Sequence, residues 1–298
     1  MIMKLDEIYS KKDLKSNIFF DSKIPPISFE VFPPKNDLDG KKLKNLLAEL
    51  EILMQYNPKL ISITYGAGGT ARDNTFLVAN SIKKFFNCDC MPHFTCINSS
   101  LTFVQDYIKQ IISSGFENIL ALKGDLPQDI KHNQQHFNFA YELIDFIYTN
   151  TNLSIAAAGY PEKHPLSVSV KDDLDNLKRK VDLGASVIYT QLFFDNTHFF
   201  RYLELVRKNN INVPIVAGIL PVISLDQINK MVKMCNASIP DSLLSKLAKC
   251  NNNLEDMMEV GINFATLQVE ELINFGVDGL HFYTLNKSYS TKRILECI

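Results

Sequence analysis

Short runs of apolar and β-branched residues alternate along the chain with longer stretches in which apolar residues recur at helical spacing. The short runs predict eight β-strands, at residues 27–32, 60–66, 90–96, 118–125, 154–160, 186–194, 214–220 and 279–285. The longer stretches place apolar residues at i, i+3, i+4 and i+7, as in the segment from Leu43 to Tyr56, and predict amphipathic helices. Strand and helix therefore alternate through nearly the whole chain.

Glycines and polar segments mark where the predicted helices begin and end. Gly115, Gly184 and Gly276 each follow a helical stretch and are expected to adopt the left-handed conformation that ends a helix. The stretch from about Ser224 to Gly276, between the last two strands, is long enough to hold an additional helical pair. The polarity and spacing of roughly the first 20 residues predict an extra N-terminal helix, in addition to the helices that connect the eight strands.

Eight strands, each apolar enough to be covered on both faces and each followed by a helix, are typical of a closed parallel barrel. The pattern therefore predicts an α/β fold, the (β/α)8 TIM barrel, rather than an open doubly wound sheet. A length of 298 residues suits one such barrel, so we expect a single catalytic domain over residues 1–298.

Charge and hydropathy exclude several classes of partner. The formal net charge is −2, from 31 basic and 33 acidic residues, which gives no reason to expect a nucleic acid or an anionic membrane surface. The N-terminal segment lacks the apolar core of a secretory signal, and no window is long and apolar enough to span a membrane. We therefore expect a soluble, cytoplasmic protein.

The chain has six cysteines, scattered without a C-x-x-C pair, which fits a reduced cytoplasmic protein better than a disulfide-bonded one. Cys88, Cys90 and Cys96 lie close together in the sequence, but their spacing matches no zinc-binding pattern. We expect no metal site.

Polar residues gather at the ends of the predicted strands, where barrels of this type carry their chemistry. In chain order they are Glu30, Thr64, Tyr65, Gly66, His93, Thr95, Lys123, Gly124, Asp125, Tyr160, His164, Gln191, His281 and Tyr283. Taken singly, Glu30 would be a loop cap or an ion-pair partner, and His93 and His281 would be satisfied core histidines. Their convergence on one mouth favours a site.

Two other segments allow more than one interpretation of their function. The glycine-rich turn from Tyr65 to Gly69 allows close approach of a ligand to backbone, but it matches neither a dinucleotide-binding fingerprint nor a P-loop. In the segment from Lys171 to Gly184, Asp173, Asn176 and Lys180 share one helical face. That face is either a solvated surface with ion pairs or a rim that grips a polar ligand.

Nine segments resemble, in order and over most of the chain, the bacterial-type methylenetetrahydrofolate reductases. They are ISFEVFPPK, SITYGAGGTARD, PHFTC, ILALKGDLP, AAGYPEKHP, LKRKVDLGA, TQLFFD, GILPV and HFYTLN. Together they are far more specific than any single motif.

The resemblance implies a barrel that holds FAD, accepts a hydride from NADH or NADPH and passes it to 5,10-methylenetetrahydrofolate, yielding 5-methyltetrahydrofolate with ping-pong kinetics. It makes Glu30 the general acid for the folate nitrogen that departs as the methylene bridge opens. A carboxylic acid has this role near neutral pH when its surroundings disfavour the anion, and the flanking Phe29, Val31 and Phe32 are expected to provide them. It also makes Asp125 a catalytic residue that contacts flavin and folate and stabilises the cationic iminium.

Further roles come from the same resemblance. The positions implied to contact FAD are Thr64, Tyr65, Ala67, His93, Lys123, Gly124, Asp125, Ala140, Tyr160, His164, Asp173, Asn176 and Lys180. Those implied to contact substrate are Asp125, Gln191, Gln227 and Lys287.

The chain departs from the family motifs at three of these places. Lys123 stands where the family usually has arginine, which keeps the charge but loses the bidentate fork. Lys287 likewise replaces an arginine. Met231 occupies a position where an aromatic residue can stack on substrate.

Two alternatives remain at the level of sequence, a proline dehydrogenase-like flavin barrel that oxidises a small amine and a non-catalytic scaffold that binds folate or flavin. The resemblance further implies a homo-oligomer that supplies methionine synthesis. We expect no C-terminal regulatory domain, because the sequence ends shortly after the eighth strand.

Overall fold

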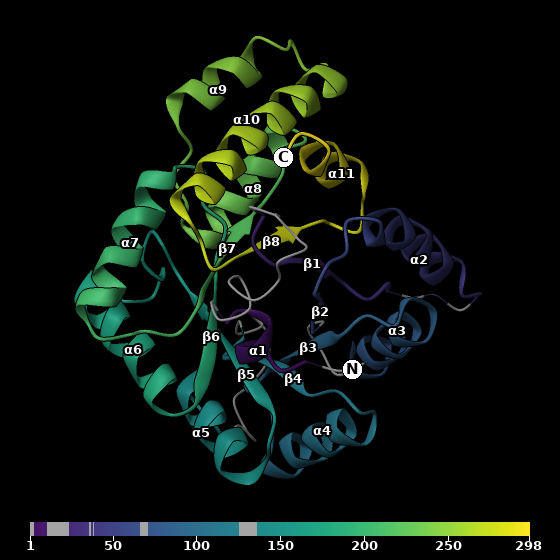
Figure 1. The fold of residues 1–298 in the computed structure, drawn as a ribbon, viewed down its shortest axis with the longest axis vertical. Helices are drawn as coiled ribbons and strands as arrows, with labels where there is room; N and C mark the ends of the chain where they lie inside the picture. The colour runs from purple at the N-terminus through teal and green to yellow at the C-terminus, as the bar shows by residue number, and fades with distance from the viewer. Residues whose placement is uncertain (1–2, 11–23, 36, 38, 66–70, 125–135) are drawn as a thin grey trace, which may run out of the picture.

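A computed structural model of the chain describes residues 3–10, 24–35, 37, 39–65, 71–124 and 136–298. Its eight strands form one closed parallel barrel in which each strand pairs with its sequence neighbours and β8 pairs with β1. Figure 1 looks into this barrel, with the helices arranged around it. The predicted fold class is confirmed.

Each strand coincides with one of the eight predicted segments and ends before that segment does, and β6 begins one residue before its segment. They are β1 Ile27–Val31, β2 Leu60–Ile63, β3 Cys90–Thr95, β4 Asn118–Leu122, β5 Ser154–Gly159, β6 Ala185–Thr190, β7 Ile215–Ile219 and β8 Gly279–Tyr283. The apolar residues that follow β6, Leu192, Phe193 and Phe194, are buried above the strand rather than in it, so hydrophobicity alone overestimates its length.

The helices are α1 Leu5–Ile8, α2 Lys41–Met54, α3 Ala71–Phe86, α4 Leu101–Ser113, α5 Ala140–Asn150, α6 Val170–Asp182, α7 Asn196–Lys208, α8 Leu225–Cys235, α9 Asp241–Ala248, α10 Leu254–Phe275 and α11 Tyr289–Leu295. The predicted glycines end helices in the left-handed region, with φ of +69° at Gly115, +120° at Gly184 and +85° at Gly276. Among the described helices, none is long and apolar enough to cross a membrane.

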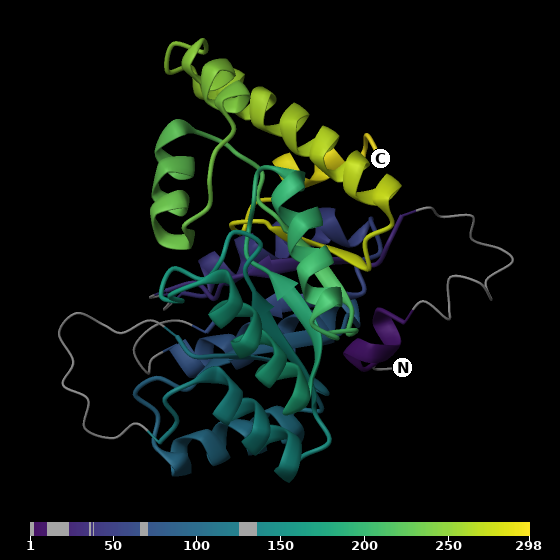
Figure 2. The ribbon, with the colours of Figure 1, turned by 90° about the vertical axis from the view of Figure 1, so that its left-hand side faces the viewer.

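The N-terminal helix closes one end of the barrel. Leu5, Ile8 and Tyr9 form a buried cluster with inward side chains of the strands, such as Met91 and Val187. Figure 2 shows α1 at one end of the barrel and α8, which follows β7, toward the other. We call the end covered by α1 the floor and the end where the strands finish the mouth. The predicted N-terminal helix is present but is only four residues long in the described part.

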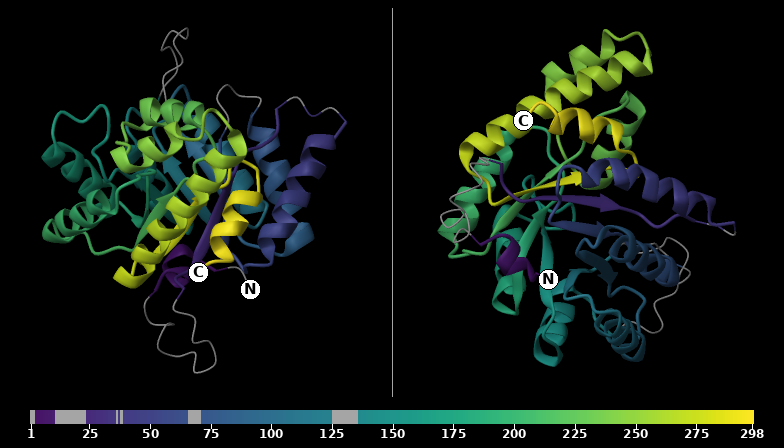
Figure 3. Two further views of the ribbon diagram at one scale, coloured as in Figure 1. Left: turned by 90° about the horizontal axis from the view of Figure 1, so that it is seen from above. Right: turned by 45° about the vertical axis from the view of Figure 1, so that its right-hand side comes forward.

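The connection between β7 and β8 contains three helices, so the predicted additional pair is confirmed in α9 and α10. Helices α8 and α9 and the start of α10 build their own apolar cluster, which includes Ile228, Leu243 and Met257. A side chain at Gly261 of α10 would meet the carbonyl oxygen of Val222 at 1.8 Å, so glycine is required for this close packing. In Figure 3 the long α10 lies beside α11.

Candidate active site

Strand β1 directs its side chains into two different environments. Phe29 and Val31 point outward into the layer between barrel and helices and are at most 1% exposed. Ser28 and Glu30 point into the barrel, because successive side chains of a strand alternate between its faces. The predicted apolar surroundings of Glu30 are therefore wrong: Phe29 and Val31 lie on the opposite face, and Phe32 is 38% exposed.

The Glu30 carboxyl group lies between two imidazoles instead. Its Oε2 atom is 3.8 Å from Nε2 of His93 and 3.9 Å from Nε2 of His281. The Glu30 side chain is 19% exposed, whereas the histidine side chains are 6% and 2% exposed. A molecule at the mouth can therefore reach the carboxyl group, while the two rings stay buried beneath it.

His93 is neutral at pH 7. Burial lowers its pKa to about 4, an effect that Glu30 partly opposes and His281 reinforces. The Nε2 atom is buried and makes no hydrogen bond within the described part of the chain. A buried ring nitrogen without a partner marks a position where a ligand or a water molecule completes the hydrogen bonding.

A column of polar side chains continues from His281 to the floor. Nδ1 of His281 is 2.8 Å from Oγ of Ser28, its direct partner in the pairing of β8 with β1. The Ser28 hydroxyl lies 3.3 Å from that of Tyr9, which is 2.7 Å from the hydroxyl of Tyr189. On the mouth side, Nε2 of His281 is 3.5 Å from Oγ of Ser62.

Sequence patterns indicate little of this column. His281 and Tyr283 stand out as polar residues of the last strand without a predicted role, and Ser28 and Ser62 do not stand out at all. The alternation of strand side chains places Ser28 on the same face as Glu30, which is the signal that could have found it. Nothing in the sequence indicates that Tyr9 reaches the barrel interior.

The shared face of Asp173, Asn176 and Lys180 on α6 turns toward the barrel. An Asp173 oxygen accepts a hydrogen bond from the backbone N–H of His164 at 3.2 Å, and the Lys180 amine donates to the carbonyl of Ala158 at 2.9 Å. Burial lowers the pKa of Lys180, and Asp173 partly opposes this. Asn176 is half-buried on the same face. The solvated-surface alternative is therefore wrong for Asp173 and Lys180.

The segment between β5 and α6 also contacts the α8–α9 connection. The rings of Tyr160 and His164 pack edge to face with centroids 4.5 Å apart. Between them in sequence, Oε2 of Glu162 accepts hydrogen bonds from the backbone N–H of Ser238 at 2.9 Å and from its hydroxyl at 2.5 Å. This contact ties one side of the mouth to α8, the helix that carries Gln227.

The exit of β4 brings Lys123 and Gly124 to the mouth. The Lys123 amine lies 5.3 Å from the centroid of the Phe139 ring, just before Ala140 at the start of α5. Gly124 has a φ of +85°, and a side chain there would come within 2.8 Å of the Thr95 side chain. Glycine therefore allows the end of β4 to lie directly against the end of β3.

The exit of β2 is only partly described. Thr64 donates its backbone N–H to the carbonyl of Val31 at 3.0 Å. The Tyr65 ring packs edge to face on Phe94, with centroids 5.5 Å apart, within an aromatic cluster of the outer layer. Ala67 and Asp125, both implied to contact the cofactor, lie outside the described residues.

The residues implied to bind substrate are more scattered. The Gln191 side-chain oxygen accepts from the next backbone N–H at 2.9 Å, and that of Gln227 accepts from the N–H four residues earlier at 2.8 Å. Met231 packs against the cluster formed by α8 and α9. Lys287 is 75% exposed and pairs with Glu49 of α2 at 3.2 Å, so the structure does not bring its amine to the mouth.

Small residues line the opposite wall of the barrel. Ala158 on β5 is half-buried at the mouth. A side chain at Gly218 on β7 would meet the Thr190 carbonyl at 2.4 Å and the Tyr283 ring at 2.9 Å. The Tyr283 hydroxyl donates to that same carbonyl at 2.8 Å, so its ring is held across β7. Burial raises the pKa of Tyr283 well above its usual value, with Glu30 adding to the effect, and the hydroxyl stays protonated.

The clustered cysteines direct their thiols at backbone carbonyl groups. Thiols of Cys88, Cys90 and Cys96 lie within 3.8 Å of backbone carbonyl oxygens to which they donate. Burial raises the pKa of Cys88 to about 12 and that of Cys96 to about 11, so both remain protonated at neutral pH. In the part of the chain with described coordinates, no group of three or more His, Cys, Asp or Glu side chains is arranged to hold a metal ion.

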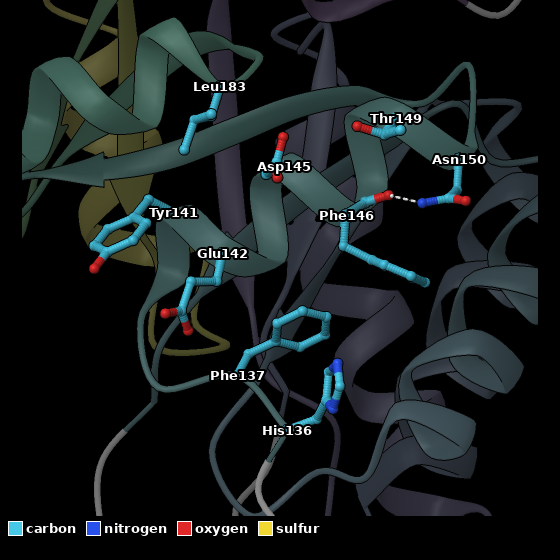
Figure 4. Close-up of a pocket in the computed structure, with 9 residues that line it drawn as sticks. All are labelled: His136, Phe137, Tyr141, Glu142, Asp145, Phe146, Thr149, Asn150 and Leu183. Atoms are coloured by element: carbon cyan, nitrogen blue, oxygen red, sulfur yellow. Dashed lines mark hydrogen bonds between the residues drawn. The ribbon is translucent and has the colours of Figure 1, made fainter.

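A cavity of about 460 Å³ lies outside the barrel, along α5. Figure 4 shows its lining, which comes from α5, the segment before it and Leu183 after α6. Its carboxylate Glu142 already accepts hydrogen bonds from the backbone N–H groups of Asn138 and Phe139 at the start of α5. No strand end contributes to this cavity, so the site of interest is the barrel mouth.

Comparison with solved structures agrees with the barrel fold. A solved structure from Clostridium thermocellum, described as binding two copies of 5-methyl-5,6,7,8-tetrahydrofolic acid, has a TM-score of 0.66 and 16% identity over 92% of this chain and 94% of that one. A dihydropteroate synthase from Coxiella burnetii gives a TM-score of 0.52 at 14% identity, over 94% of this chain and 93% of that one. At these identities the likeness shows the fold alone.

Sequence relatives are more informative. The 5,10-methylenetetrahydrofolate reductase of Buchnera aphidicola from Schizaphis graminum is 37% identical over 261 residues, 88% of this chain and 87% of that protein. The Salmonella typhimurium enzyme is 36% identical over 88% of this chain and 86% of its own. An Arabidopsis thaliana methylenetetrahydrofolate reductase (NADH) is 35% identical over 90% of this chain, which spans only 47% of the plant protein.

The methylenetetrahydrofolate reductase family profile matches residues 16–298. That range contains β1 to β8 and both Glu30 and His281. The chain therefore belongs to the methylenetetrahydrofolate reductase family.

Proposed function

We propose that this protein reduces 5,10-methylenetetrahydrofolate to 5-methyltetrahydrofolate, with FAD as the bound carrier and NADH or NADPH as the hydride donor in a ping-pong reaction. The observation that carries the proposal is the placement of Glu30. It is a half-buried carboxyl group open to the mouth of a barrel in this family, with two buried imidazoles beneath it. The wider consequence is a supply of methyl groups for methionine synthesis.

The residues of the mouth fit FAD. A flavin needs hydrogen-bonding partners at its ring edge, and the Nε2 atom of His93 is buried and unpartnered within the described residues. A diphosphate needs positive charge, which Lys123 and Lys180 provide. Ala158 on β5 keeps its part of the wall free of a large side chain, so that a flat ring has room there. Thr64, Tyr160, His164, Asp173 and Asn176 would complete this cradle, together with Tyr65, Ala67, Gly124 and Ala140.

When bound, FAD supplies hydride transfer between the nicotinamide donor and the folate. The protein's own contribution is a proton. Opening of the methylene bridge breaks a carbon–nitrogen bond, and the departing nitrogen takes its proton from the Glu30 carboxyl group, which becomes a carboxylate. The acid must face the substrate, and the Glu30 carboxyl group does so from the mouth, beside the neutral His93 ring.

Other side chains would orient the substrate and stabilise charge. Asp125 follows Gly124 and would stabilise the cationic iminium that forms when the bridge opens. Gln191 directly follows β6 and Gln227 lies in the first turn of α8, and the two would bond the pterin or the nicotinamide. Lys287 would meet the folate tail only by leaving Glu49, and because the lysine is 75% exposed this ion pair separates at little cost.

We also propose that residues 1–298 act as one catalytic barrel, that the protein is cytoplasmic and that it assembles as a homo-oligomer. The family match and the single closed barrel support the first point. The described cysteines form no disulfide, which agrees with a reducing compartment.

The test is anaerobic reduction and reoxidation of the FAD-reconstituted protein. NADH or NADPH is expected to bleach the flavin absorbance, 5,10-methylenetetrahydrofolate is expected to restore it, and mass spectrometry is expected to find 5-methyltetrahydrofolate. Reduction by NADH without reoxidation by folate would contradict the proposal and favour another flavin enzyme. Direct reduction of the flavin by proline or another small amine would identify the proline dehydrogenase-like alternative, and folate binding without any flavin reduction would indicate a scaffold.

A further inference from the structure

We propose that His281 is a positioning residue for Glu30, held by Ser28 as the tautomer with its proton on Nδ1, so that the lone pair of Nε2 faces the acid. This inference deepens the proposed function and rests on it for its catalytic consequence. The hydrogen-bond donors and acceptors of the polar column determine the tautomer.

The Ser28 hydroxyl has one proton and two lone pairs, and its nearest polar groups are the Leu280 carbonyl, the Tyr9 hydroxyl and Nδ1 of His281, with the Tyr189 hydroxyl also nearby. The carbonyl of Leu280, 3.3 Å away, can only accept, so the Ser28 proton satisfies it. The Tyr9 hydroxyl at 3.3 Å and Nδ1 of His281 at 2.8 Å must then both donate to Ser28. Tyr189, 2.7 Å from Tyr9, donates to the Tyr9 oxygen in turn. Every contact of Ser28 is satisfied in this arrangement.

The far side of the ring leads to the same tautomer. The nearest polar atoms to Nε2 are Oγ of Ser62 at 3.5 Å and Oε2 of Glu30 at 3.9 Å, both beyond the usual range for an N–H donor. His281 is 2% exposed, so a proton on Nε2 would be a buried donor without a good acceptor. An orphaned buried N–H costs about 1–3 kcal/mol, and placing the proton on Nδ1 avoids that cost.

A consequence for Glu30 follows. With Nδ1 protonated, His281 presents only a lone pair to Oε2, and only the protonated form of the Glu30 carboxyl group can donate to it. The distance between Oε2 of Glu30 and Nε2 of His281 reaches hydrogen-bond length with a shift of about 1 Å. His281 thereby orients the proton of the Glu30 carboxyl group near the mouth. The departing folate nitrogen receives this proton when that nitrogen lies closer to the carboxyl group than Nε2 of His281 does. The O–H bond of Glu30 breaks and the N–H bond of the folate forms, while His281 stays neutral.

The first arm of the test observes the tautomer directly. The FAD-loaded full chain is labelled at its six histidines, and two-dimensional nitrogen–proton NMR correlates each ring nitrogen with the ring carbon-bound protons. The His281 signals, assigned by their loss in His281→Asn, are expected to show a protonated Nδ1 and an unprotonated Nε2. Ser28→Ala is expected to abolish this pattern, and Tyr9→Phe is expected to keep it, because Tyr9 bonds only to the second lone pair of Ser28.

The second arm measures the two half-reactions separately. His281→Asn retains an amide near the position of Nδ1 but has no atom in place of Nε2. The rate of flavin reoxidation by folate is expected to fall on the order of tenfold or more, with flavin reduction by NADH unchanged. His136→Asn is the matched control, since His136 is exposed and lines the cavity outside the barrel. Ser28→Ala provides a second variant, should His281→Asn fold poorly.

The outcomes separate the two claims. A protonated Nε2 in the native protein overturns the inference, as does an unchanged folate half-reaction in both His281→Asn and Ser28→Ala. If folate does not reoxidise the native flavin, the proposed function fails, and the NMR arm alone decides whether Ser28 fixes the tautomer of His281.

Discussion

The inside of the barrel has two unlike sectors. On β8, β1, β2 and β3, inward positions carry His281, Ser28, Glu30, Ser62 and His93, which we call the polar sector, although Leu60 and Met91 of the same strands are apolar. On β4 to β7, inward positions carry Leu120, Ala156, Val187 and Val216, which we call the apolar sector, although Tyr189 of β6 bonds to Tyr9 of the polar column. The polar sector fills part of the barrel interior with groups that contribute little to stability, whereas the packing of the apolar sector holds the strands together. We therefore expect mutations in the apolar sector to cost stability and mutations in the polar sector to cost activity.

Truncation in the apolar sector is expected to have the largest effect on stability. Leu120→Ala removes buried methyl groups next to Met91 and Val187, and should lower the free energy of unfolding by about 2–5 kcal/mol. Urea unfolding of the purified protein measures this as a lower midpoint at unchanged slope. Leu77→Ala, on an exposed position of α3, is the control and should change little. Equal effects of the two variants would mean that the apolar sector does not hold the barrel together.

The buried imidazole of His93 is expected to make the protein sensitive to acid. Its pKa is about 4 in the folded state, below the usual 6.5, so between these values the unfolded chain binds the proton and the folded chain does not. The titration of His93 therefore leaves the free energy of unfolding unchanged above pH 6.5. As pH falls below this value the free energy of unfolding decreases, by about 3 kcal/mol near pH 4. His93→Gln should flatten this part of the curve of unfolding free energy against pH. A slope equal to that of the native protein would show that His93 titrates normally.

Removal of a hydroxyl from the polar sector is expected to have the smallest effect on stability. Ser62→Ala deletes a contact of 3.5 Å to His281, which is too long to be a strong hydrogen bond. The change in unfolding free energy should stay below about 1 kcal/mol. Calorimetric unfolding of this variant beside Leu120→Ala compares the two sectors in one measurement. A loss as large as that of Leu120→Ala would erase the distinction between them.

The sequence predicted the barrel well because its signal is repeated eight times and each strand is apolar on both faces. It also predicted that Glu30, His93 and His281 share the barrel interior, since these residues stand on or near strand ends. It did not predict the partners of Glu30, because they are set by register: Ser28 lies opposite His281, and Glu30 opposite Ser62 and Tyr283. Such pairs are separated by up to 253 residues, and no local pattern indicates them.

The sequence was also misleading in one respect. Phe29 and Val31 flank Glu30 in the chain, but the alternation of strand side chains turns them toward the helices. A neighbour in sequence is therefore not a neighbour in the barrel. The electrostatic surroundings of a strand residue come from the strands on either side.

The most direct test of this account is anaerobic stopped-flow on the FAD-reconstituted native protein and Glu30→Gln, with Glu51→Gln on the exposed face of α2 as control. Flavin absorbance is followed first on addition of NADH and then on addition of 5,10-methylenetetrahydrofolate. We predict flavin reduction within about twofold in all three proteins and reoxidation by folate at least about a hundredfold slower in Glu30→Gln alone. Reoxidation of Glu30→Gln at the native rate would contradict the assignment of Glu30 as the acid.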